Sequence, residues 1–155
     1  MTDGTLLQIH TAVATGRPMT EQEAVRAIPG LGLEGDRYAN SKGKYSRSPG
    51  VREVTFFEAE VLVRLKEDYG IDLQPREHRR NLTTEGVVLS HLIGQTFSIG
   101  DVTFEGLRPC RPCRYLNLMS KKQVSARLEN QAGLFCRVLS EGTLRLGDPI
   151  RLEQF

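Results

Sequence analysis

The chain has 155 residues, and 21 lysines and arginines against 19 aspartates and glutamates give it a formal net charge of +2. Its 39% hydrophobic and 26% charged residues are typical of a folded protein and exclude a disordered one. No apolar run approaches the roughly 20 residues of a membrane span, and so small a charge does not favour a nucleic-acid partner. The length predicts one domain over residues 1–155, with a core that needs no disulfides.

The chain begins MTDGTLLQIH, without a basic stretch followed by an apolar one. A secretory signal is therefore not expected, and we predict a cytoplasmic protein without a membrane partner. Its three cysteines are an odd number, and a reducing compartment disfavours disulfides. The sequence thus predicts free thiols, whose role must be something other than a disulfide.

The first predicted element is a half-buried strand over residues 7–12, where Leu7, Ile9 and Thr11 alternate with the residues between them. Residues 29–51 follow with many glycines and no apolar periodicity. Between Asp36 and Arg52 there is a single acid and five basic residues, Arg37, Lys42, Lys44, Arg47 and Arg52. Long loops in compact domains are usually functional, so we expect this segment to face an anion.

A helix is predicted over residues 56–69. Thr55 and Glu58 have the spacing of a capping box, and Gly70 suits the C-terminal end. Its apolar stripe at helical spacing comprises Phe57, Val61, Leu62, Leu65 and Tyr69. A shorter helix is predicted over residues 121–129.

The C-terminal half contains two similar segments, TFSIGD at residues 96–101 and TLRLGD at residues 143–148. In both, Gly-Asp lies between two alternating runs, which predicts two β-hairpins. Many short strands, few helices and no βαβ rhythm predict a mainly β fold, a β-barrel with peripheral helices.

The segment RPCRPCR, residues 108–114, places Cys110 and Cys113 in a C-x-x-C spacing between arginines, which favour the thiolate. Structural zinc lacks a second ligand pair, and a thioredoxin-type site lacks its βαβ context. A reactive cysteine that binds a soft metal or carries sulfur remains, as does a simply buried thiol. The buried alternative suits Cys136, in the apolar strand predicted at residues 134–139, better than it suits Cys113.

Two further segments offer anion-binding groups. In REHRRNLTTEG, residues 76–86, His78, Arg79 and Arg80 supply charge and planar donors, and Asn81 and Thr83 supply further polar groups. The alternative is a basic surface turn. In GLEGDRY, residues 32–38, glycines permit close approach of a ligand and Arg37 adds charge.

These segments, taken in order, resemble the MOSC family, the domain found at the C-terminus of molybdenum cofactor sulfurases and as standalone bacterial proteins. The stretches that carry the resemblance are GLGLEGDRY, REVTFFEAE, RRNLTTEG, IGQTFSIGDVTFE, RPCRPCRYL and GLFCRVLSEGTLRLGDPIRLE, which span nearly the whole chain. Their order and spacing make the match specific, and the short length is similar to the standalone form.

The resemblance implies a barrel of the pyruvate-kinase barrel-like type and a role with the molybdenum cofactor, a pterin that carries a phosphate. It implies that Cys113 ligates molybdenum in a reductase of N-hydroxylated compounds, or holds a persulfide as a sulfur carrier, with Cys110 as an assisting thiol. A third alternative is a non-catalytic binding or carrier protein for the cofactor. The residues implied to bind the cofactor are Arg37, Arg52, Arg79, Arg80, Asn81 and Thr83.

The resemblance also implies partners. We expect a small-molecule substrate or cofactor, and either an electron-donor protein or a cysteine desulfurase. Aromatic residues make up 6% of the chain and do not interleave with the basic segments, so a nucleic-acid partner is not expected.

Overall fold

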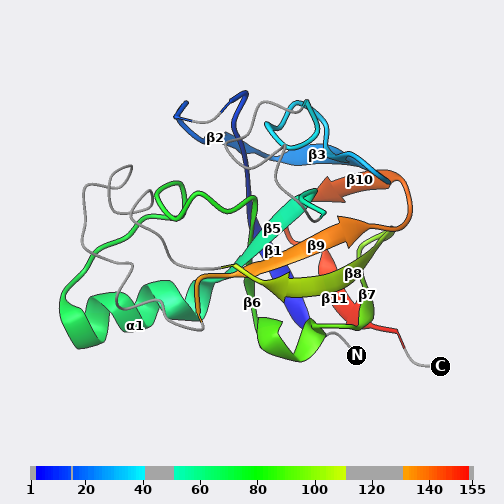
Figure 1. Cartoon of the computed structure of the whole chain (residues 1–155). Helices are drawn as coiled ribbons and strands as arrows, with labels where there is room; N and C mark the ends of the chain where they lie inside the picture. Colours follow the sequence, from blue (N-terminus) through cyan, green and yellow to red (C-terminus); the bar gives the residue numbers. More distant parts are fainter. Residues whose placement is uncertain (1–2, 15, 41–50, 111–130, 154–155) are drawn as a thin grey trace.

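The computed structural model describes residues 3–14, 16–40, 51–110 and 131–153. Short strands dominate it, with the helix α1 (Ala59–Tyr69) and the 3₁₀ turn η1 (Leu89–Leu92) beside them (Figure 1). The strands are β1 (Gly4–Thr11), β2 (Thr20–Gln22), β3 (Ala24–Ile28), β4 (Gly32–Leu33), β5 (Val54–Glu58), β6 (Leu82–Glu85), β7 (Thr96–Ile99), β8 (Val102–Pro109), β9 (Leu134–Val138), β10 (Gly142–Arg145) and β11 (Pro149–Leu152).

Seven strands close into a barrel in the order β11-β7-β8-β9-β5-β6-β1, because β1 also pairs with β11. All of these pairings are antiparallel except β5–β6, which is parallel and is connected through α1. β2 extends the sheet beyond β1, and β10-β3-β4 form a small second sheet. The mainly β barrel expected from the sequence is confirmed.

Aromatic rings fill the barrel interior. The ring centroid of Phe56 lies 5.7 Å from that of Phe97 and 5.4 Å from that of Phe104, both edge-on. All three side chains are fully buried, and burial of one such ring stabilises the fold by roughly 1.5–3 kcal/mol. The same cluster includes Leu6, Ile9, Leu82, Ile99, Leu134 and Ile150 from the surrounding strands.

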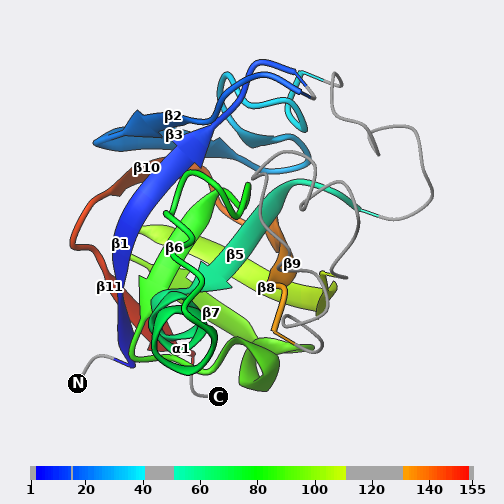
Figure 2. The ribbon, with the colours of Figure 1, turned by 90° about the vertical axis from the view of Figure 1, so that its left-hand side faces the viewer.

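A second apolar cluster lies between the barrel wall and α1. Figure 2 shows the helix α1 nearly end-on beside the barrel. Neighbouring side chains on a strand point to opposite faces, so Phe56 enters the barrel while Phe57 faces the helix. Phe57 packs there with Val61 and Leu65 of α1. Cys110 and Ala132 belong to the same cluster, which brings the end of β8 and the start of β9 beside the helix.

The predicted capping box is wrong. Residues 54–58 form β5, and α1 begins only at Ala59, with Glu58 at the N-cap position and no side-chain cap. Pairing with β6 and β9 outweighs the local helix signal, and the Thr55 hydroxyl bonds Asn81 instead. The predicted end is confirmed: Gly70 has φ 66°, and its N–H reaches the Lys66 carbonyl at 3.0 Å.

One of the two predicted hairpins is confirmed, since β7 and β8 pair across Gly100. The other is wrong: β10 pairs with β3, whereas β11 pairs with β7 and β1. The predicted first strand exists, but a register shift between Leu6 and Gln8 changes its inward face. Leu6 and Ile9 are fully buried while Leu7 is half-buried, because a bulge adds one residue to the alternation.

The helix predicted at residues 121–129 lies outside the described residues. Within the described ranges, no helix is long and apolar enough to cross a membrane.

We predict that Gly106→Ala destabilises the barrel by about 3 kcal/mol or more, because the added methyl group overpacks the backbone. A Cβ at Gly106 would lie 2.0 Å from the backbone oxygen of Leu92. To relieve this clash, the backbone of β8 or of η1 would have to move. Urea denaturation measures the loss. Gly30→Ala is the control: it has open space and φ 79°, so it should cost only about 1 kcal/mol of backbone strain. Equal losses in the two variants would contradict the close-packing argument.

Candidate functional site

Arg37 is held by the turn that follows β4. It is 6% exposed, and its Nη1 lies 3.1 Å from Oδ1 of the fully buried Asp36. Asp36 also accepts the backbone N–H of Ala12 at 3.0 Å, which fixes the turn to the end of β1. Nη2 of Arg37 donates to the Arg79 carbonyl at 2.9 Å. The predicted segment around Arg37 therefore meets the predicted segment around Arg79.

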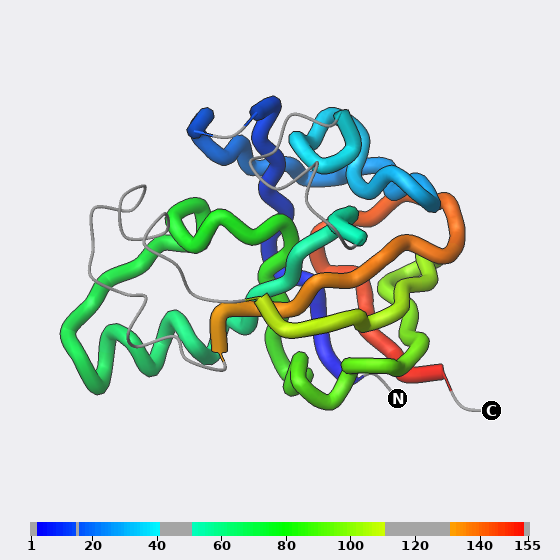
Figure 3. Tube along the Cα trace, in the orientation of Figure 1, coloured from blue at the N-terminus to red at the C-terminus, as the bar shows by residue number. Residues whose placement is uncertain are grey.

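His78, Arg79 and Arg80 lie between α1 and β6. Figure 3 shows this segment returning from α1 to the barrel. Arg79 has φ 63°, the one non-glycine residue at positive φ among those described, at a cost of roughly 1–2 kcal/mol. Arg80 donates its backbone N–H to His78 Nδ1 at 2.9 Å and its Nε to the Ala132 carbonyl at 2.8 Å. Strain of this kind is often retained at functional sites.

The sequence suggested that His78 supplies charge at the surface, and the structure shows that it does not. It is fully buried, stacks on Phe57 at 4.2 Å between ring centroids, and contacts Thr83 Oγ1 through Nε2 at 2.8 Å. Burial, together with the charge of Arg80 and the nearby His10, holds the pKa of His78 well below its usual range. The ring is therefore neutral and structural.

Asn81 and Thr83 point into the protein. Asn81 Oδ1 accepts the N–H and the hydroxyl of Thr55, each at 3.0 Å, and Nδ2 donates to the His10 carbonyl at 3.1 Å. The Thr83 hydroxyl meets His78, as described above. Both side chains therefore make their hydrogen bonds inside the protein. Their role toward a cofactor stays a prediction.

Arg52 and Arg108 both lie against the ring of Phe135 in β9. Their guanidinium carbons lie 5.7 Å and 4.5 Å from the centroid of the Phe135 ring, within the range of cation–π contacts. Arg108 Nη2 also donates to the Val51 carbonyl at 2.9 Å. Burial and the charge of Arg52 lower the pKa of Arg108. Arg108 was visible in the sequence only as a neighbour of the cysteines.

Cys110 follows β8 and is 3% exposed, with its N–H bonded to the Gly133 carbonyl at 2.8 Å. Burial raises the pKa of its thiol, although Arg80 and Arg108 act in the opposite direction. Burial also raises the pKa of Cys136 well above its usual range, as expected for a core cysteine. Cys110 is therefore a protonated thiol here, and Cys113 lies outside the described residues.

Arg37, Arg52, Arg79, Arg80 and Arg108 together form what we call the arginine cluster. They come from separate segments of the chain, yet the contacts above link them around the turn at residues 78–80 and the start of β9. The buried carboxylates of the described residues are only Asp36 and Glu53, and Glu53 accepts the N–H of Val138 at 3.0 Å. The cluster therefore carries an excess of positive charge, which suits an anion.

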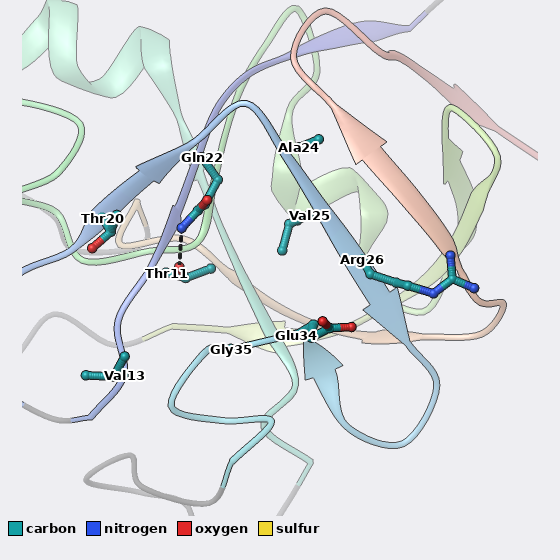
Figure 4. A pocket seen from close by; sticks show the side chains of 9 residues that line it. All are labelled: Thr11, Val13, Thr20, Gln22, Ala24, Val25, Arg26, Glu34 and Gly35. Carbon is teal, nitrogen blue, oxygen red and sulfur yellow. Dashed lines mark hydrogen bonds between the residues drawn. The ribbon is translucent and has the colours of Figure 1, made fainter.

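A cavity of about 420 Å³ lies between β2, β3 and the turn at residues 34–35 (Figure 4). Thr11, Thr20, Gln22 and Glu34 give it polar walls, and Gln22 Nε2 donates to Thr11 Oγ1 at 3.3 Å. None of the residues predicted to bind the cofactor lines it. Through Gly35 the cavity adjoins Asp36, so it is a neighbour of the arginine cluster.

Among the described residues, no three histidine, cysteine, aspartate or glutamate side chains form a group that could hold a metal ion. A metal site built on Cys113 would include residues outside the described ranges. The described part of the chain contains the arginines of the predicted site, and their role in binding an anion stays a prediction.

A closed seven-stranded barrel with the helix α1 packed on its wall is the fold class that these elements define. The MOSC domain family matches residues 43–151, so the chain belongs to the MOSC family. No curated protein matches it.

Solved structures show the same fold. YuaD from Bacillus subtilis superposes with a TM-score of 0.80 at 15% identity, covering 100% of this chain and 97% of its own. YiiM from Geobacillus stearothermophilus gives 0.69 at 18% identity, covering 99% and 75%, and YiiM from Escherichia coli gives 0.66 at 20% identity, covering 96% and 71%. At these identities the likeness is one of fold.

Two buried threonines should respond oppositely to replacement by valine, which has nearly the same shape. The Thr55 hydroxyl donates to Asn81 Oδ1 and accepts the Asn81 N–H, whereas Thr84 Oγ1 has no hydrogen-bond partner within the described residues. We predict that Thr55→Val loses about 2–4 kcal/mol of unfolding free energy, since it orphans buried polar groups. Thr84→Val should be neutral or stabilising. Urea denaturation of the two variants measures their unfolding free energies. A comparable loss in both would contradict the hydrogen bonding assigned to the two hydroxyls.

Stability should fall as the pH drops below about 6.5. Burial lowers the pKa of both His10 and His78, so the unfolded chain takes up protons before the folded one does. Each histidine can contribute up to about 1.4 kcal/mol per pH unit within that window. Urea denaturation between pH 7.5 and 5.5 measures the slope.

The matched control for this slope is the double variant His10→Gln, His78→Asn, which should have a flatter profile. Burial and Glu60 raise the pKa of Glu58, which acts in the opposite direction, so the difference between the two proteins is the quantity to report. Parallel profiles would contradict the assignment to the histidines.

Proposed function

We propose that the chain binds the molybdenum cofactor at the arginine cluster and, with Cys113 as a metal ligand, reduces N-hydroxylated compounds. The observation that carries this proposal is the cluster itself, which gathers guanidinium groups from separate segments, with Arg80 and Arg108 near Cys110. Membership in the MOSC family supports the choice of cofactor, since the family is associated with it.

The donor set fits the phosphate of the pterin. A guanidinium group offers up to two parallel hydrogen bonds to a phosphate, and such charge-assisted bonds are about twice as strong as neutral ones. Arg37 is oriented by Asp36 and by the Arg79 carbonyl, and Arg80 is oriented by the Ala132 carbonyl. Their positions are therefore set before a ligand arrives, which lowers the ordering cost of binding.

The metal-binding half rests on chain connectivity. Cys113 follows Cys110 by three residues, and three extended residues span at most about 11 Å. A thiolate is a soft ligand that must be deprotonated to bind a metal, and neighbouring arginines favour that form. When bound, the cofactor would supply the transfer of electrons to the substrate, while the protein binds, orients and shields it.

Metal analysis tests the proposal. Protein purified from a host that makes the cofactor should contain about one molybdenum per chain, as expected for a bound prosthetic group. Cys113→Ser should lose the metal, and Arg80→Gln should reduce its content, because each lost charged hydrogen bond weakens binding by roughly tenfold or more. Cys136→Ala and Arg137→Gln are the controls, since the first lies in the core and the second pairs with Glu105 on the barrel's outer face.

Absence of molybdenum from the wild-type protein under these conditions would overturn the reductase proposal. One added sulfur on Cys113 after incubation with a cysteine desulfurase, read by mass spectrometry, would instead support the sulfur carrier. Cofactor retained in the Cys113→Ser variant would support the non-catalytic binding protein.

A further inference from the structure

The peptide group between Arg79 and Arg80 is gripped on both of its polar atoms by side chains. Its carbonyl oxygen accepts from Arg37 Nη2 at 2.9 Å, and its N–H donates to His78 Nδ1 at 2.9 Å. Both bonds depend on the orientation of this one peptide plane. A flip of the plane would break the two bonds together and point the carbonyl toward the imidazole lone pair.

This peptide follows a residue in a costly conformation. Arg79 has φ 63°, where a side chain other than glycine is disfavoured, so the backbone would relax unless it were held. Arg37 is itself anchored by Asp36, and Asp36 by the N–H of Ala12. His78 is anchored by its stack on Phe57 and by Thr83. The restraint therefore extends to the ends of β1 and β5 and to β6.

The contact with Arg80 determines which ring nitrogen of His78 carries the proton. A backbone N–H can only donate, so Nδ1 must be the acceptor. The neutral ring then has its proton on Nε2, which donates to Thr83 Oγ1 at 2.8 Å. Each nitrogen of His78 thus has a defined role, and the ring cannot adopt the other tautomer without losing the Arg80 contact.

The orientation of the same peptide affects the direction of Arg80. Arg80 continues from it to the Ala132 carbonyl at 2.8 Å, and the next residue, Gly133, accepts the N–H of Cys110. A flip would therefore disturb both the arginine cluster and the segment that leads to the C-x-x-C sequence.

We propose that His78 is a positioning residue: with Arg37 it locks the Arg79–Arg80 peptide in the orientation that directs Arg80 toward an anion. This inference deepens the proposed function and rests on it. His78 itself touches no ligand, and it acts only through the peptide it holds.

Two substitutions of His78 separate positioning from packing. His78→Asn keeps an oxygen acceptor near the place of Nδ1, whereas His78→Gln carries its amide toward the place of Nε2 and leaves the Arg80 N–H without its acceptor. Both variants lose the stack on Phe57, so their unfolding free energies should fall by similar amounts. They differ in the one contact that the proposal requires.

The binding probe is inorganic phosphate, titrated into the full chain by calorimetry. His78→Asn should bind phosphate within about threefold of wild type, and His78→Gln should bind it about tenfold or more weakly, because a misplaced charged donor loses its geometry. Equal affinities in the two variants, whether strong or weak, would overturn the positioning role.

Two measurements on the wild-type protein need no variant to fold. Nitrogen-15 NMR should show the Nε2–H tautomer of His78, and hydrogen exchange should show a protected Arg80 amide. The other tautomer or a rapidly exchanging amide would overturn the proposed lock. If wild-type protein fails to bind phosphate while both signatures are present, the anion-binding function fails and the lock itself stands.

Discussion

The side chain of Asn81 joins three strands of the barrel, and the candidate site depends on that junction. Its amide bonds the backbone of β1 at His10 and both the backbone and hydroxyl of Thr55 in β5, while Asn81 itself immediately precedes β6. A buried amide with these bonds fixes where β6 begins. The turn at residues 78–80 comes directly before it, so the position of Arg79 and Arg80 follows from an interaction inside the barrel wall.

The fold of the barrel brings the positive charges of the arginine cluster together. Several guanidinium groups in one place repel each other and lose hydration, which is unfavourable without a partner. Backbone carbonyls and the Phe135 ring compensate part of this cost, as the contacts of Arg108 with Val51 and Phe135 illustrate. The remaining positive charge favours an anionic ligand.

Several features were predictable because they depend on local chemistry. The alternating runs around Gly100, the strand that contains Cys136 and the helix end at Gly70 are as expected. The errors came where distant pairing competes with a local signal. Thr55 and Glu58 have the spacing of a capping box, but Thr55 pairs with Phe135 across β5 and β9 and bonds Asn81. Likewise, residues 142–145 pair with β3 rather than with the strand that follows them.

The sequence by itself was sufficient for the barrel class and the family, since these follow from hydrophobic alternation and from the order and spacing of motifs along the chain. It could not show that His78 is buried and neutral, that Arg37 grips the Arg79 carbonyl, or that Arg52 and Arg108 share the Phe135 ring. Those facts depend on contacts between residues far apart in the chain. Hydrogen bonding and burial at such contacts exist only once the barrel has closed, and they bring separate basic segments together as one arginine cluster.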